Sequence, residues 1–140
     1  MKNITLTLAA TIALLGLATT ASAHHSAVQF DFTKQVPIKG VVKHFRAINP
    51  HMQMILAVTD AKGTHDIEFE GHSTNNMYRN GYRKGMINVG DAITVNVAPL
   101  KDGHEGGYVV SAVTASGEPF GMKSRNLADA AKIQAQAEGK

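Results

Sequence analysis

Histidines near the start of the chain are the residues with the clearest capacity for chemistry. His24 and His25 directly follow Ala23, and His51 stands further along, after a proline. If the chain is cut after Ala23, the new α-amine and the Nδ1 of His24 chelate one metal ion, and a further imidazole completes a three-nitrogen set. Copper(II) stands highest in the affinity order of the divalent ions for such ligands. The pattern therefore predicts a copper site at His24, His25 and His51.

Two methionines beside His51 extend this hypothesis. Met52 and Met54 offer thioether sulfurs, which are soft ligands for copper(I). Their spacing of two residues is also that of side chains on one face of a strand, which predicts core positions instead. The plainer interpretation of His24 and His25 is an ordinary solvated chain start, and His51 alternatively caps a turn through a backbone contact.

The metal hypothesis depends on a cleavage site. Residues 1–3 carry one lysine, residues 4–18 are apolar apart from Thr and Gly, and Ala21 and Ala23 supply the small side chains that signal peptidase requires. This pattern predicts a signal peptide over residues 1–23 and a mature protein in the periplasm. The rival interpretation is a membrane anchor, which needs about 20 consecutive apolar residues. The run here is shorter, so we expect no membrane span after cleavage.

Composition limits the remaining classes of function. Removing residues 1–23 leaves 117 of 140, which suits one domain with a modest core. The formal net charge of +3 is too small for an electrostatic nucleic-acid binder, so we expect no nucleic-acid partner. Cysteine is absent, which excludes disulfides and thiolate ligands. The chain has no Ser-His-Asp order, zinc-protease motif or phosphate loop, so we expect a non-catalytic protein.

The elements that must position these residues are mostly strands. Alternating apolar side chains predict five of them, and a change of phase near Lys43 and His44 predicts a β-bulge in the first. Ser73 or Thr74 caps a predicted short helix that runs through Asn80. The predicted strands cover residues 37–48, 51–59, 64–70, 92–98 and 108–114.

The resulting order, β-β-β-α-β-β, is that of the OB-fold, a small all-β barrel. A five-stranded sandwich of another topology is the alternative. The predicted barrel domain covers residues 36–120, after an extended N-terminal arm over residues 24–35. Residues 121–140 form a predicted helical tail, with a peripheral helix over Leu127–Ala137.

A second polar cluster surrounds the predicted short helix. Such a group on the rim of a barrel is suited to a small anion or a sugar, because barrel mouths are common ligand sites. The alternative is a solvated helix with ordinary surface charges. Glu68 and Glu70 lie two residues apart and so share one face of a predicted strand. An antiparallel sheet commonly exposes such a polar face to solvent. The rim residues are Glu70, His72, Asn75, Arg79, Tyr82 and Arg83.

Several short motifs, in a fixed order, resemble a known family. They are His24-His25-Ser26, Asn49-Pro50-His51, Phe69-Glu70, Arg79-Asn80-Gly81-Tyr82 and Val89-Gly90-Asp91. In these residues the chain resembles a family of small exported proteins of unknown function from Gram-negative bacteria, over residues 24 to about 120. The resemblance implies a compartment and a fold, and no activity.

We therefore expect an exported, periplasmic, non-catalytic binding domain that takes copper through the mature N-terminal histidine. The alternative is an interaction module that docks on another envelope protein or on a saccharide, through the barrel face and the arm.

Overall fold

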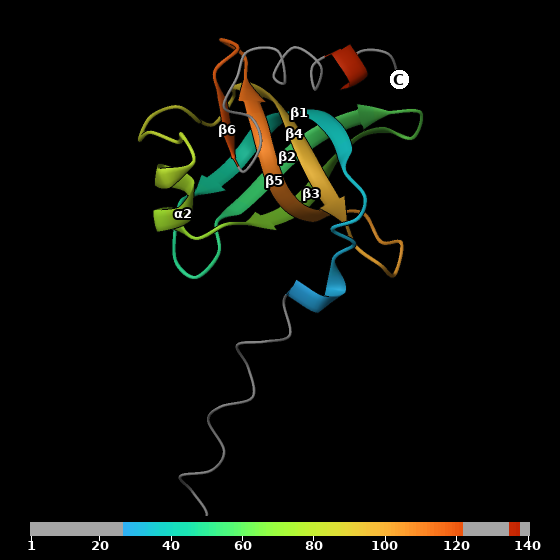
Figure 1. Ribbon diagram of the computed structural model, residues 1–140. Helices are drawn as coiled ribbons and strands as arrows, with labels where there is room; N and C mark the ends of the chain where they lie inside the picture. Colours follow the sequence, from blue (N-terminus) through green and yellow to red (C-terminus); the bar gives the residue numbers. More distant parts are fainter. Residues whose placement is uncertain (1–26, 122–134, 138–140) are drawn as a thin grey trace, which may run out of the picture.

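The described residues of the chain form a small β-barrel with few and short helices (Figure 1). The computed structural model describes residues 27–121 and 135–137. Several predicted features therefore lie outside the described residues: the predicted signal peptide over residues 1–23, His24, His25 and most of the predicted C-terminal tail. Ala135–Ala137 are helical. No helix in the described ranges is long and apolar enough to cross a membrane.

The elements are η1 (Ala27–Gln29), β1 (Val36–Arg46), β2 (Gln53–Asp60), β3 (Gly63–Gly71), α2 (Thr74–Arg79), β4 (Ala92–Pro99), β5 (Gly107–Thr114) and β6 (Pro119–Gly121).

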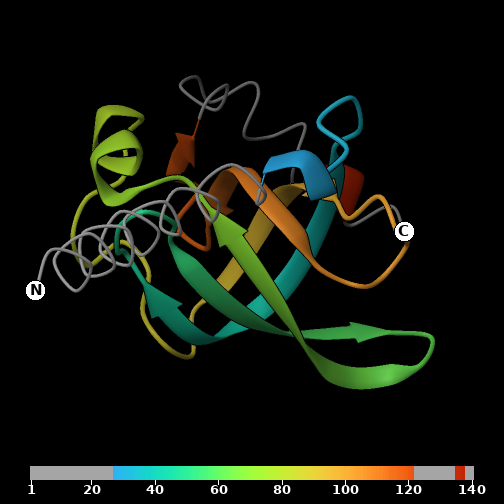
Figure 2. The ribbon, with the colours of Figure 1, turned by 90° about the horizontal axis from the view of Figure 1, so that it is seen from below.

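The strand order confirms the predicted barrel. Neighbours in the sheet follow the order β3-β2-β1-β4-β5-β6, and each of these pairs is antiparallel. A parallel pairing of β3 with β5, through Phe69–Gly71 and Gly107–Val109, brings the ends of the sheet together. Figure 2 shows the β2–β3 hairpin, in green, extending beyond the closed part of the barrel. With α2 between β3 and β4, this is the OB arrangement.

Strand β1 bends to serve both halves of the barrel. Its first part, Val36–Val41, pairs with β4, and its second part, Val41–Arg46, pairs with β2. The register shifts between Val42 and His44, which confirms the predicted bulge. An extra residue on one strand increases local bend and twist, so the bulge lets one long strand change partners.

The core lies inside the barrel and follows the predicted alternation. On β2, Met54, Leu56 and Val58 are buried, and Ile67 and Phe69 continue this face on β3. Val95, Val97 and other residues of β4 and β5 fill the opposite side. Met52 and Met54 are each 1% exposed and belong to this cluster.

The short helix α2 covers one end of the barrel. The Ser73 hydroxyl accepts a hydrogen bond from the Asn76 amide (3.4 Å), which is the predicted cap, and Asn80 closes the other end. Gly81 follows with φ +103°, a conformation that favours glycine. Tyr82 is 4% exposed and packs against Phe45 and Phe120.

Three residues near the C-terminus form a sixth strand that the sequence pattern does not predict. β6 (Pro119–Gly121) pairs with β5 through Ser111–Val113 and buries Phe120 in the core. A strand this short carries no alternation that could be detected. The predicted barrel boundary at residue 120 cuts through this strand.

The described part of the predicted arm is anchored and not simply extended. Residues Ala27–Gln29 form the 3₁₀ turn η1, and Phe30 makes an isolated bridge with Leu100. Phe30 is 3% exposed, and its ring lies 5.5 Å from that of Tyr108. The chain therefore enters the barrel beside the start of β5.

Candidate functional site

His51 and His72 come together at the end of the barrel where β3 and β5 meet. Backbone hydrogen bonds hold them there: the Met52 amide donates to the His72 carbonyl (3.1 Å), and the Gly71 amide donates to the Met52 carbonyl (3.2 Å). Both imidazoles stand edge-on to the Tyr108 ring, with centroid distances of 6.2 Å for His51 and 5.0 Å for His72. We call His51, His72 and Tyr108 the histidine cluster.

The tautomer of His51 is set by its hydrogen bond. Its Nδ1 lies 3.1 Å from the Gly71 carbonyl oxygen, which can only accept. The Nδ1 atom therefore carries the proton, and the lone pair of the neutral ring is on Nε2. Histidines that bind metals through Nε2 commonly donate their other ring N–H to a carbonyl in this way.

His72 has a similar arrangement with a side-chain partner. Its Nδ1 lies 2.9 Å from the Tyr108 hydroxyl oxygen. Its Nε2 is buried and has no hydrogen-bond partner among the described residues. A buried polar atom left in this state is destabilising, and a bound ion or another ligand would remove the penalty.

Burial also fixes the charge states of the cluster. Desolvation, and then the charge of His51, lower the pKa of His72 below its ordinary value of 6.5. Burial, and then the nearby Glu70 carboxylate, raise the pKa of Tyr108 to about 12. The His72 imidazole and the Tyr108 phenol are both neutral at neutral pH, and neutral imidazole is the form that ligates metals.

This lowered pKa predicts a loss of stability in mild acid. Unfolded His72 takes up a proton near pH 6.5, whereas the folded side chain resists it, so the stabilisation is present above that pH and lost as the pH falls through the lowered pKa. Urea unfolding of the metal-free protein between neutral and mildly acidic pH measures this loss. We expect the His72→Gln variant to show a flatter pH dependence, and the exposed His104→Gln control to follow the wild type. Parallel curves for wild type and His72→Gln would contradict the assignment.

The predicted rim residues do not form one surface. Glu70 and His72 lie at the histidine cluster, whereas Tyr82 is a core residue. Arg83 donates from Nη1 to the carbonyl oxygens of Tyr78 (3.0 Å) and Tyr82 (2.7 Å) and so secures the loop after α2. Asn75 and Arg79 are on α2.

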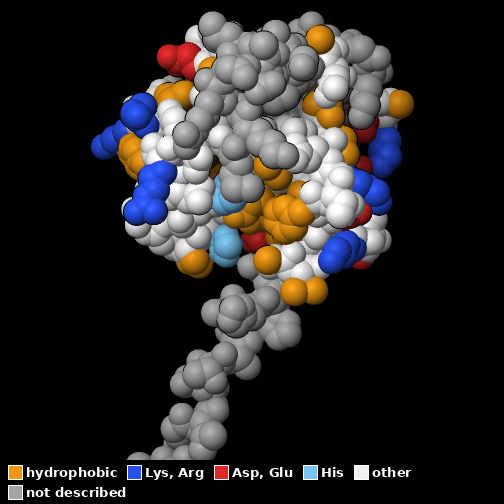
Figure 3. Space-filling view, in the orientation of Figure 1, with side chains coloured by type: hydrophobic (Ala, Val, Ile, Leu, Met, Phe, Trp, Pro, Cys, Tyr) orange, Lys and Arg blue, Asp and Glu red, His pale blue; other side chains and the backbone are white. Residues whose placement is uncertain are grey.

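The predicted sulfur ligands belong to the core. Met52 and Met54 are among the most buried side chains in the described ranges, which agrees with the strand interpretation of their spacing. His51, in contrast, precedes β2 instead of beginning it, and its ring reaches Tyr108. Figure 3 shows histidine side chains beside a hydrophobic patch on this face of the molecule.

A second histidine-containing group lies at the far end of the β2–β3 hairpin. Ligand atoms of Asp60, His65 and Glu105 lie within 4.8 Å of one another. The Lys62 ammonium already pairs with Glu105 (2.7 Å), and His65 Nε2 lies 3.1 Å from the same carboxylate. Asp60 and Glu105 are exposed, and the Glu105 carboxylate already forms an ion pair with Lys62. Exposed ion pairs of this kind contribute little to stability.

The fold and the histidine cluster together define an OB-type barrel with a pair of oriented imidazoles at one end. The chain belongs to a family of unknown function (DUF6152), whose match covers residues 12–109. No curated protein and no solved structure matches the chain. The matched range includes every member of the histidine cluster.

Proposed function

We propose that the chain is an exported protein whose mature form binds copper(II) through His24, His51 and His72. The observation that carries the proposal is the pair of imidazoles with occupied Nδ1 atoms. Both rings lie against Tyr108, and the Nε2 of His72 is a buried atom without a hydrogen-bond partner in the described part of the chain. Two imidazoles and one amine chelate suit copper(II).

The chain enters the barrel close to this pair. Residues 24–26 precede the η1 turn at Ala27, and an extended segment of that length would span about 10 Å. The Phe30 and His72 rings both lie against Tyr108, at 5.5 and 5.0 Å. The α-amine and Nδ1 of His24 would then complete the coordination, with His25 as a further ligand through its peptide nitrogen.

The cluster also supplies the support that metal ligands need. Ligating histidines bind more tightly when the second ring nitrogen is held by a carbonyl or hydroxyl partner. His51 has the Gly71 carbonyl and His72 has the Tyr108 hydroxyl. Binding is the function proposed, and no reaction is assigned to the ion.

Protein recovered from the periplasm tests both export and copper(II) binding. N-terminal sequencing should give a start at His24, and a start at Met1 would contradict export. Calorimetric titration with copper(II) should then show one tight site. An otherwise identical protein whose N-terminal α-amine is acetylated cannot form the amine chelate, and its affinity should fall by at least about tenfold. Equal affinity of the two forms would contradict the site.

A further inference from the structure

The outer face of β1, β2 and β3 contains a groove that the copper proposal does not use. Its volume is about 450 Å³, within the range of about 300–1,000 Å³ that is usual for ligand sites. Strands 2 and 3 form the ligand face of many OB-folds. We call it the strand-face groove. Its lining includes Gln29, His44, Gln53, Ile55, Glu68, Glu70 and Leu100.

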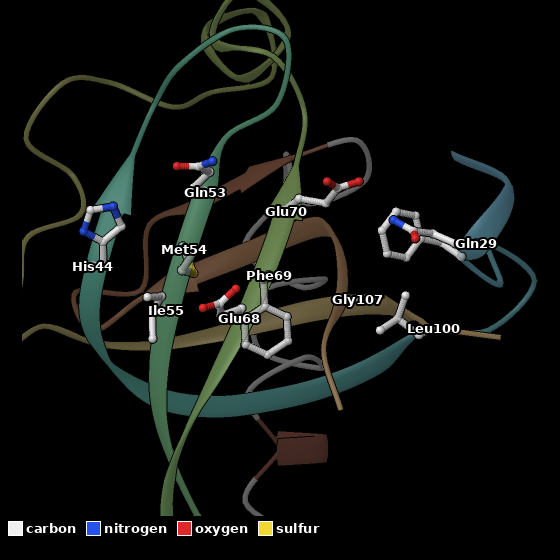
Figure 4. A pocket seen from close by; sticks show the side chains of 11 residues that line it. Gln29, His44, Gln53, Met54, Ile55, Glu68, Phe69, Glu70, Leu100 and Gly107 are labelled. Carbon is white, nitrogen blue, oxygen red and sulfur yellow. The ribbon is translucent and has the colours of Figure 1, made fainter. Parts of the chain in front are cut away.

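Pairing between the strands explains how these side chains meet. Ile55 on β2 is paired with His44 on β1 and with Glu68 on β3, and Gln53 is paired with Glu70. Figure 4 shows these side chains across the sheet, with Gln29 and Leu100 facing Glu70 from the other side. The groove therefore has hydrogen-bonding groups along its length and apolar contacts between them.

Two glutamates of β3, Glu68 and Glu70, line the groove. Neither Glu68 nor Glu70 takes part in an ion pair with any residue of the described ranges. The Oε1 atom of Glu70 is buried and has no hydrogen-bond partner in those ranges. A buried carboxylate oxygen without a donor is destabilising, and a charged N–H donor from a ligand is the strongest remedy.

The charge of the groove is opposite to that of the whole protein. The chain has a net charge of +3 and a pI of about 9.3, so its overall charge does not attract a cationic molecule. Attraction for such a molecule has to come from a local site. The same carboxylates oppose a phosphate backbone, which separates this groove from the OB faces that bind oligonucleotides.

We propose that the strand-face groove binds a basic peptide segment of a partner protein. Lysine or arginine side chains donate to the carboxylates of Glu68 and Glu70, and their aliphatic stems pack against Ile55 and Leu100. The amides of Gln29 and Gln53 are placed to bond the backbone of the peptide. Binding here needs no metal ion.

A fluorescein-labelled hexapeptide of alternating arginine and glycine tests the proposal by anisotropy, with metal-free mature protein and chelator present. The Glu68→Gln/Glu70→Gln double variant should lose at least about tenfold in affinity, because it removes both charged acceptors of the arginine side chains. A peptide with glutamine in place of arginine should bind no better to the wild type than to the double variant.

The Asp66→Asn variant is the matched control. Asp66 is exposed on the same strand and outside the groove, so its loss changes the net charge without changing the site. Its affinity should stay within about twofold of the wild type. An equal loss in Asp66→Asn would show general electrostatics and overturn the proposal. No binding by the wild type, or tighter binding of maltohexaose than of the peptide, would also overturn it.

Discussion

Replacing His72 with alanine is expected to lower the copper(II) affinity of the mature protein by about 100-fold or more. The variant removes one of the two imidazoles that lie against Tyr108, and leaves an amine chelate and a single ring. A titration against a competing chelator measures the change directly. The metal-free variant should remain folded, because the His72 side chain is only half-buried and lies at the end of the barrel.

Two further variants separate ligation from other effects. His104→Ala removes an exposed histidine from the loop before β5, and its copper affinity should match the wild type. Tyr108→Phe keeps the ring and removes the oxygen that holds Nδ1 of His72, so the affinity should fall by about tenfold. Wild-type affinity in His72→Ala, or an equal loss in His104→Ala, would remove His72 from the site.

Replacing Gly107 with alanine is expected to destabilise the protein by about 3–5 kcal/mol. Gly107 is the first residue of β5 and pairs with Phe69 where the barrel closes. Its φ is +150°, and an added Cβ would collide with the backbone carbonyl of Ala98 and the side chain of Val97. Neither neighbour can move easily, because both belong to buried β4. The change is measured as a shift in the urea midpoint.

Gly103→Ala is the control for backbone conformation alone. Gly103 has a φ of +82°, and nothing lies within 4 Å of the position of an added Cβ. We expect a loss of about 1 kcal/mol there, from the unfavourable conformation. Similar losses for the two variants would mean that the close approach at Gly107 relaxes without penalty.

Most of the barrel could be predicted from the sequence because its signals are local. The alternation Met52-Met54-Leu56-Val58 identifies a strand, and the change of phase near Lys43 identifies the bulge. Each of these depends on neighbours in the chain, which is the range over which periodicity carries information.

The site could be predicted only in part because it is made by distant segments. The place of His51 after Pro50 indicates it as a candidate, whereas the local sequence groups His72 with the polar residues around the short helix. The parallel pairing of β3 with β5 brings His72 to Tyr108, and no local pattern indicates that pairing. Tyr82 shows the opposite error, since a polar neighbourhood in the sequence gives no sign that Phe45 and Phe120 enclose its ring.

The closure between β3 and β5 has a consequence for the order of assembly. Tyr108 and His72 are 36 residues apart, and they meet only when the fifth strand docks beside the third. Contacts between residues so distant in sequence carry a large loop-closure entropy and tend to form late in folding. The histidine cluster therefore does not exist in the unfolded chain. Metal uptake by this site would accordingly mark the end of folding and would not guide its beginning.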